Sequence, residues 1–187
     1  MRGQSETPQG YTISNFRIPA MASVSLENLV LTEEETEALH ETWQLVAKDL
    51  KGNGVKFFLH FFQTFPEYQR KFKGFADVPL VQLAENKRLK AHAFTVLNAI
   101  NGLIDNLDDL EVLNELLFKT GQNHIKRNLK ISDFQNLKEN LHEFLQLALG
   151  EAFTPTASVA WKKLLTTMQL LYRTTSYNFL IFSVITQ

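Results

Sequence analysis

The sequence contains no cysteine, and this absence excludes several kinds of site at once. None of the 187 residues can form a disulfide, act as a thiolate nucleophile, or bind an iron–sulfur cluster or zinc through sulfur. A chain without disulfides fits a reducing compartment. Any metal chemistry must therefore use histidines, carboxylates or a bound cofactor.

Long apolar runs and a strong charge of one sign are also missing. The formal net charge is -1 and no run of five or six basic residues occurs, so the chain lacks the electrostatic footprint of a nucleic-acid-binding protein. The apolar stretch YNFLIFSVITQ at the C-terminus falls well short of the roughly twenty residues that span a membrane. We expect no nucleic-acid partner and no clear association with a membrane.

The two ends of the chain differ in composition from the middle. Residues 1–30 are rich in polar residues, glycine and proline and have no apolar run after a basic start, which predicts a flexible extension rather than a secretory signal. Arg2 and Arg17 leave a transit peptide as the alternative, but we expect a cytoplasmic protein. Residues 31–176 should form one folded domain, and residues 177–187 a C-terminal extension that either continues the last helix or covers a surface patch.

The motifs of common enzyme classes are absent too. The sequence has no glycine-rich phosphate loop, no GxSxG, no HExxH and no pair of histidines four positions apart. The sequence therefore lacks the motifs that phosphoryl transfer, serine hydrolysis and the usual zinc chemistry require. We expect a protein that is not an enzyme in its main role.

What the sequence does contain is helical periodicity. Apolar residues recur at spacings of three and four, and no segment alternates for long, so we predict an all-α fold with seven to eight helices. The first helix should start at Thr32, where Thr32 and Glu35 form a capping box, and end near Gly52 or Gly54. Ser132-Asp133 should cap a later helix, and Thr154-Pro155 should open the last.

Phenylalanines are concentrated in one segment. Seven of the fifteen lie between positions 57 and 75. The spacing of Phe58, Phe61, Phe62 and Phe65 predicts one buried helix face, while Phe72 and Phe75 fall in the loop after Pro66. Aromatic side chains in a loop often line a ligand slot.

Two histidines stand on apolar helix faces. His124 continues the stripe of Leu110, Leu113 and Leu117, and His92 shares a face with Leu89, Val96, Ile100 and Leu103. A single inward histidine is more often a core residue that bonds to a backbone carbonyl. Two inward histidines on separate helices, beside a phenylalanine-rich slot, instead suit a flat apolar cofactor. One of the two imidazoles would coordinate the metal of that cofactor. Haem is the natural candidate, and we interpret His40, His60 and His142 as surface or structural residues.

The sequence resembles the animal globins, in particular intracellular invertebrate globins and the neuroglobin–cytoglobin group. The resemblance runs from about Leu31 to Tyr172. Its motifs are Trp43 in the first helix, Phe65-Pro66 followed by Phe72, the segments LKAHAFTV and NHIKRNLKISDF, and Trp161-Lys-Lys-Leu in the last helix.

The resemblance implies a globin fold around one haem b. It implies that His124 is the proximal iron ligand and His92 the distal histidine, with Val96 in the distal pocket. It further implies that Phe72 stacks on the porphyrin, that Phe75 and Leu129 line it, and that Phe58 lies above the iron. Thr120 departs from the leucine that is common four residues before the proximal histidine, so either a backbone carbonyl near Thr120 or its hydroxyl would accept the free N–H of His124.

Three functions follow as expectations. The first is reversible binding of O2, for storage, transport or sensing, with CO and NO as further ligands. In this first case His92 either only donates a hydrogen bond to bound gas or itself binds the iron when no gas is present. The second is a reductant-dependent nitric oxide dioxygenase or weak peroxidase, which would need an external reductase. The third, a helical interaction module without haem, is disfavoured by the two inward histidines.

Overall fold

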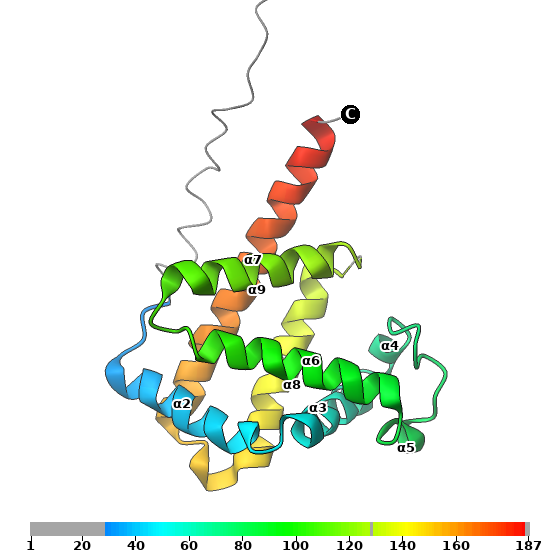
Figure 1. Cartoon of the computed structure of the whole chain (residues 1–187), viewed down its shortest axis with the longest axis horizontal. Helices are drawn as coiled ribbons and strands as arrows, with labels where there is room; N and C mark the ends of the chain where they lie inside the picture. The colour runs from blue at the N-terminus through cyan, green and yellow to red at the C-terminus, as the bar shows by residue number, and fades with distance from the viewer. Residues whose placement is uncertain (1–28, 128, 186–187) are drawn as a thin grey trace, which may run out of the picture.

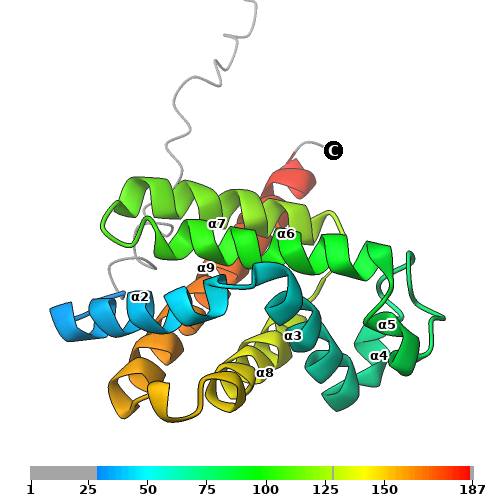
Figure 2. The ribbon, with the colours of Figure 1, turned by 60° about the horizontal axis from the view of Figure 1, so that its bottom comes forward.

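The computed structural model describes residues 29–127 and 129–185, with side chains described as far as Arg173. The described residues form eight α-helices and one short 3-10 helix and contain no strand, which confirms the predicted all-α fold. In Figures 1 and 2, α6 and α7 run side by side across α9. In chain order the elements are α2 (Glu33–Ala47), α3 (Leu50–Thr64), α4 (Pro66–Gln69), α5 (Leu80–Leu83), α6 (Lys87–Ile104), α7 (Leu110–Ile125), α8 (Ile131–Leu149), η2 (Gly150–Ala152) and α9 (Pro155–Ile185).

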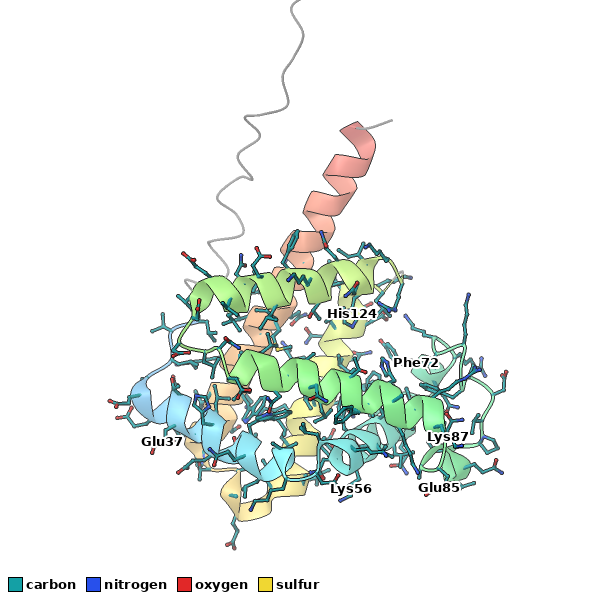
Figure 3. The ribbon with its side chains drawn as sticks, viewed as in Figure 1. Glu37, Lys56, Phe72, Glu85, Lys87 and His124 are labelled. Atoms are coloured by element: carbon teal, nitrogen blue, oxygen red, sulfur yellow. The ribbon has the colours of Figure 1, made fainter. Side chains whose placement is uncertain are left out.

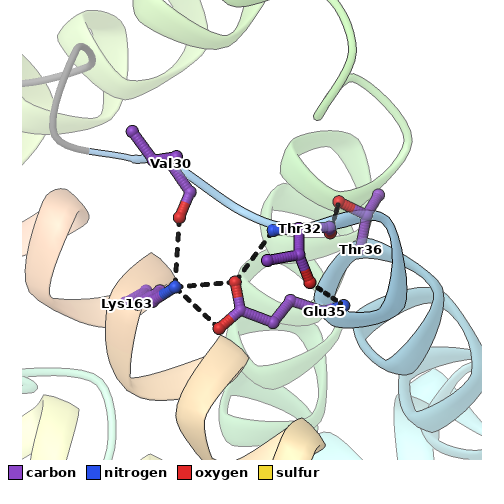
Figure 4. Close-up of polar contacts among 5 residues, drawn as sticks. All are labelled: Val30, Thr32, Glu35, Thr36 and Lys163. Atoms are coloured by element: carbon purple, nitrogen blue, oxygen red, sulfur yellow. Dashed lines mark hydrogen bonds and ion pairs between the residues drawn. The ribbon is translucent and has the colours of Figure 1, made fainter.

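The start of α2 is fixed by the predicted capping box and by α9. The Thr32 N–H donates to Glu35 Oε2 at 2.9 Å, and the Glu35 N–H donates to Thr32 Oγ1 at 3.2 Å. Lys163 of α9 lies 2.6 Å from Glu35 Oε1 and donates to the Val30 carbonyl at 3.1 Å (Figure 4). The ammonium of Lys163, through its hydrogen bond, holds the pKa of Glu35 below its ordinary value. One carboxylate thus both caps α2 and joins it to the last helix.

The boundary between α2 and α3 differs from the prediction. The first helix ends at Ala47, and Gly52 and Gly54 lie inside the next helix, so the expected end at these glycines was wrong. The Asp49 carboxylate accepts the Gly52 N–H at 2.8 Å and begins α3. A Cβ at Gly54 would lie 2.9 Å from the carbonyl oxygen of Ala93 in α6, so this glycine allows α3 and α6 to cross closely.

The two tryptophans join three helices in the core. Trp43 of α2 and Trp161 of α9 pack with ring centroids 5.9 Å apart. The Trp43 indole N–H donates to Asn101 Oδ1 of α6 at 2.9 Å, and that of Trp161 donates to Thr42 Oγ1 at 2.9 Å. Both indole N–H groups therefore have a hydrogen-bond acceptor inside the protein.

Helix α3 is buried on more than the one face that its spacing predicted. Phe57 packs on Phe144 of α8 at 5.6 Å, while Phe58, its neighbour in sequence, packs on His92 of α6 at 5.0 Å. Phe57, Phe58, Phe61 and Phe62 are all at most 3% exposed. The helix lies between α6 and α8, so both sides of the aromatic segment have partners.

The last two long helices begin close to the predicted positions. Helix α8 starts at Ile131, where the Asp133 carboxylate reaches back to accept the Lys130 N–H at 2.8 Å, so Ser132 is not the cap. Thr154 caps α9, because its hydroxyl accepts the Ala157 N–H at 3.2 Å.

Helix α9 runs without interruption to Ile185, so the C-terminal tail continues the last helix as far as that residue. Figure 1 shows this end of α9 projecting past α7. Nearly all of the predicted N-terminal extension lies outside the described residues. Within the described part of the chain, no helix is both long enough and apolar enough to cross a membrane.

Candidate functional site

His92 stands on α6 inside a group of aromatic rings. Its imidazole lies 5.0 Å from the ring of Phe58 and 5.0 Å from the ring of Phe72, with both ring pairs at 63°. Phe58 comes from α3 and Phe72 from the segment after α4. Three parts of the chain therefore bring these side chains together.

The segment that carries Phe72 and Phe75 is held in place by its own contacts. Phe75 stacks on Phe72 at 5.1 Å and 15°, and Phe62 meets Phe72 edge-on at 5.4 Å. The Gln69 side-chain amide lies within hydrogen-bond distance of the Phe75 and Val78 carbonyls, at 2.9 and 2.7 Å. Phe75 is buried and Phe72 half-buried, so Phe72 presents part of its ring beside His92.

The position of His92 on α6 differs slightly from the expected stripe. The most buried residues of this helix include Leu89, Ala93 and Leu97, while His92 and Val96 are half-buried at the edge of that face. The core face is centred on Ala93, whose backbone carbonyl lies close to Gly54 of α3. His92 and Val96 consequently flank the packed core on one side of α6, one turn apart.

Burial keeps the His92 imidazole neutral. Removal from water, together with the smaller effects of His124 and Arg127 in the same direction, lowers the pKa of His92 to about 4. No described residue forms a hydrogen bond with its ring nitrogens. At neutral pH the ring therefore offers one lone pair and one free N–H.

His124 approaches this region from α7. Its Nδ1 donates to the Thr120 carbonyl one turn earlier at 2.7 Å, which leaves the Nε2 lone pair free. The Thr120 hydroxyl donates to the Leu116 carbonyl at 2.8 Å, so the backbone, not the hydroxyl, orients the imidazole. Burial lowers the pKa of His124 as well, and it too is neutral at neutral pH. The buried stripe of α7 starts at Leu113, since Leu110, its first residue, is 49% exposed.

Two residues beside His124 were not identified from the sequence. The Phe134 ring meets the His124 ring edge-on at 5.1 Å and stacks on Tyr172 at 3.8 Å. The Tyr172 hydroxyl donates to the Leu129 carbonyl at 2.5 Å, which fixes the backbone after α7. Phe134 ends the segment NHIKRNLKISDF and Tyr172 occupies an ordinary apolar helix position, but nothing in the sequence assigns either residue to the site.

The predicted residues thus fall into two groups, one around His92 and one around His124. Figure 3 shows His124 on α7 and Phe72 near α4, both toward the space between α7 and the start of α6. Phe58, Phe72 and His92 are in mutual contact, Phe75 joins them through Phe72, and Leu129 lies on the His124 side. Two neutral imidazoles with free nitrogens and aromatic walls fit a planar apolar group that carries a metal at its centre.

Comparison with known proteins agrees with this geometry. The family model described as "Globin" matches residues 55–170 of the chain. The chain is a globin. The family implies a haem cofactor and O2 or other diatomic gases as its ligands, and its members are in general carriers rather than enzymes.

Relatives of this globin include vertebrate and mollusc proteins. Cytoglobin-1 of Danio rerio is 32% identical over 139 residues, which cover 72% of this chain and 79% of that protein. A globin of Buccinum undatum is 31% identical over 139 residues, or 73% of this chain and 94% of that one. The Globin-2 B chain of Anadara inaequivalvis is 28% identical over 145 residues, or 77% and 95%.

Two other histidines of the globin have structural contacts, as their sequence positions predicted. His60 Nδ1 lies 3.2 Å from Asn140 Oδ1, which joins α3 to α8. His142 Nε2 lies 3.0 Å from the Ser158 hydroxyl and joins α8 to α9. Neither is in contact with the rings around His92 or His124 in the described structure.

Proposed function

We propose that this globin binds O2 reversibly at one haem b, with His124 as the proximal iron ligand. The observation that carries the proposal is the hydrogen bond from His124 Nδ1 to the Thr120 carbonyl, because it fixes the tautomer whose Nε2 can coordinate a metal. When bound, haem supplies an iron atom that takes up diatomic gases. The residues of the chain must hold it, exclude water and provide the hydrogen bond to the gas.

His92 is the distal residue in this proposal. Its neutral ring has an N–H that no described residue uses, and this N–H can stabilise the partial negative charge of bound O2. The other nitrogen can bind the iron itself when no gas is present. In that state O2 competes with His92, and the apparent affinity falls with the fraction of protein whose site is open.

The apolar residues have separate tasks. Phe72 would stack on the porphyrin, and Phe75 supports it by stacking on the Phe72 ring at 5.1 Å. Phe58 and Val96 exclude water from the distal side, which slows oxidation of the iron. Leu129 lines the proximal side, where Tyr172 holds its backbone.

Reconstitution with haem tests this function. The ferrous, gas-free protein should bind one haem per chain, and exposure to O2 and then removal of O2 should convert its visible spectrum reversibly. A chain that takes up no haem, or whose spectrum does not respond to O2, would contradict the proposal.

The enzymatic alternative uses the same residues. A nitric oxide dioxygenase or weak peroxidase would need electrons from an external reductase. Sustained consumption of NO in the presence of a reductase, at a rate well above that of spontaneous oxidation, would favour this alternative over a carrier.

The proposal also covers the bounds of the folded domain and the cellular compartment of the protein. We infer a globin domain over residues 31–176 with extensions at 1–30 and 177–187, in the cytoplasm. Limited proteolysis should remove residues 1–30 and leave a fragment that keeps its haem, and cell fractionation should locate the protein.

A further inference from the structure

Polar side chains join α4 and the segment after it to the start of α8. Lys71 Nζ lies 2.6 Å from Asp133 Oδ2, across 62 positions of the sequence. The same carboxylate oxygen accepts the Lys130 N–H at 2.8 Å, and the Asn136 side-chain amide donates to the Tyr68 hydroxyl at 2.9 Å. We call the ion pair of Lys71 and Asp133 the clasp.

The carboxylate of the clasp is charged although it is largely removed from water. The Asp133 side chain is 10% exposed and that of Lys71 is 36% exposed. Burial by itself would raise the pKa of Asp133, but the hydrogen bonds from Lys71 and from the Lys130 N–H outweigh it and hold that pKa below its ordinary value. Because little water screens this carboxylate, its attraction to Lys71 is stronger than that of a fully exposed pair.

Tyr68 provides a packed base for the lysine of the clasp. The Lys71 ammonium lies 5.2 Å from the centre of the Tyr68 ring, and that ring packs on Phe61 of α3 at 5.0 Å. Tyr68 is buried. The ammonium therefore lies between a buried ring of α4 and a carboxylate of α8, which restricts the conformations that it can adopt.

Each member of the clasp directly precedes a ring of the candidate site. Phe72, the residue after the lysine, has its ring 5.0 Å from that of His92. Phe134, the residue after the aspartate, has its ring 5.1 Å from that of His124. One ion pair thus connects the group of rings around His92 with the group around His124.

The other polar contacts around Phe72 lie within its own segment. Helix α4 has only four residues and no side-chain cap, and the Phe72 N–H donates to the Gln69 carbonyl at 3.0 Å. The Gln69 side-chain amide bonds to carbonyls of the same segment. Such contacts fix the shape of the segment, but its position relative to α8 depends on contacts that leave it.

We propose that Lys71 and Asp133 are positioning residues for the haem. Their ion pair holds Phe72 at a fixed position relative to the His124 side of the site, so that the rings on both sides contact the haem together. This inference rests on the proposed function, because it concerns the same haem. When the ion pair is removed, the segment is free to move away from α8, and the haem is lost faster.

The first test compares four full-length haem-loaded proteins. Beside the unchanged chain, Lys71→Met removes the charge and keeps most of the apolar stem, and Lys71→Arg keeps the charge. Lys73→Met makes the same change in charge at an exposed position of the same segment, where the lysine has no ion-pair partner among the described residues. Transfer of haem to an excess of an apoglobin acceptor should be about tenfold faster in Lys71→Met and should change by less than about twofold in the other two variants.

A double-mutant cycle tests whether the two residues act as a pair. Asp133→Asn removes the charge, while its side-chain oxygen can still accept the Lys130 N–H. The double variant Lys71→Met/Asp133→Asn should lose haem no faster than the faster of the two single variants, because the second change removes an interaction that is already absent. Effects that multiply in the double variant would overturn the proposal.

Two further readouts separate positioning from a general loss of stability. The haem-methyl resonances of the cyanide-bound ferric protein respond to the position of neighbouring rings, so Lys71→Met should shift them and Lys71→Arg should leave them in place. Hydrogen exchange of the Phe72 and Phe75 amides should be about tenfold faster in Lys71→Met, while the midpoint of urea unfolding should change little.

Equal acceleration of haem loss in Lys71→Met and Lys73→Met would indicate a general effect of positive charge near the haem and would overturn the proposal. So would unshifted haem-methyl resonances in Lys71→Met. If the unchanged chain took up no haem, the proposed function would fail and this inference with it. Normal haem uptake and O2 binding, with an unaltered rate of haem loss in Lys71→Met, would remove only the clasp.

Discussion

His124 and Thr120 are joined by a 2.7 Å hydrogen bond between the ring Nδ1 and the backbone carbonyl one turn earlier. Because the acceptor belongs to the backbone, the orientation of the imidazole does not depend on the side chain at position 120. The threonine hydroxyl bonds to the Leu116 carbonyl instead. A residue that differs from the common globin pattern thus leaves the support of His124 intact.

The first prediction concerns this threonine. Thr120→Val should leave the rate of haem loss unchanged and alter the free energy of unfolding by no more than about 1 kcal/mol, the value of one net hydrogen bond. Transfer of haem to an excess of an apoglobin acceptor measures the first quantity, and urea unfolding the second. Rapid haem loss in this variant would mean that the hydroxyl holds the ring after all.

The second prediction concerns His124 itself. His124→Ala should lose haem or hold it far more loosely, because the proposed iron–protein bond on that side is removed while the aromatic walls remain. Free imidazole should restore part of the binding, since it can fill the vacated space. His40→Ala is the matched control, as His40 lies on α2 away from the site. Retention of haem with an unaltered spectrum in His124→Ala would refute its role as a ligand.

The third prediction compares two phenylalanines. Phe72 contacts His92, whereas Phe61 packs on Phe57 and Tyr68 within the core. Phe61→Ala should lower the free energy of unfolding by about 3–5 kcal/mol, as large-to-small core changes do, without a specific effect on haem. Phe72→Ala should mainly accelerate haem loss, by about tenfold for each 1.4 kcal/mol of stacking and burial that is removed. Equal haem-loss rates in the two folded variants would place Phe72 outside the pocket.

The fourth prediction concerns the sixth coordination position. If His92 binds the iron in the absence of gas, the ferrous spectrum should be low-spin with split visible bands. His92→Leu should then convert it to a high-spin, five-coordinate spectrum and speed up association of CO measured by flash photolysis, because no internal ligand has to leave. A high-spin gas-free spectrum in the unchanged protein would leave His92 only as a hydrogen-bond donor to O2.

The fifth prediction concerns the crossing of α3 and α6. Gly54→Ala places a Cβ 2.9 Å from the Ala93 carbonyl oxygen, so the two helices must separate and the protein should lose about 1–3 kcal/mol of stability. Gly102→Ala on α6 meets only a flexible Leu116 methyl at 3.9 Å and should stabilise by about 0.5–1 kcal/mol through its helix propensity. Thermal and denaturant unfolding measure both changes. A neutral Gly54→Ala would show that the crossing tolerates a methyl group.

Signals that act within one helical turn could be interpreted from the sequence alone. The capping box of Thr32 and Glu35, the helix start at Pro155 and the position of Phe72 after Pro66 all depend on neighbours a few residues away. The same is true of the two imidazoles on apolar faces, and these sufficed to predict a helical haem protein. The predicted end of the first helix was wrong because a glycine can either stop a helix or allow a neighbouring helix to approach closely. The sequence pattern does not distinguish the two, and Gly54 does the latter.

The sequence by itself determined that the chain is helical, where most of its helices start, and that two histidines lie on apolar helix faces. Only the tertiary structure decided what surrounds them. The Tyr172 hydroxyl meets the Leu129 carbonyl across 43 positions, and the Phe134 ring lies between Tyr172 and His124. Likewise, Lys51 and Phe94 line the same surface hollow only because α3 crosses α6. Periodicity fixes which side of a helix a residue occupies, but which helix lies opposite depends on how all the helices pack together, and no local pattern contains that information.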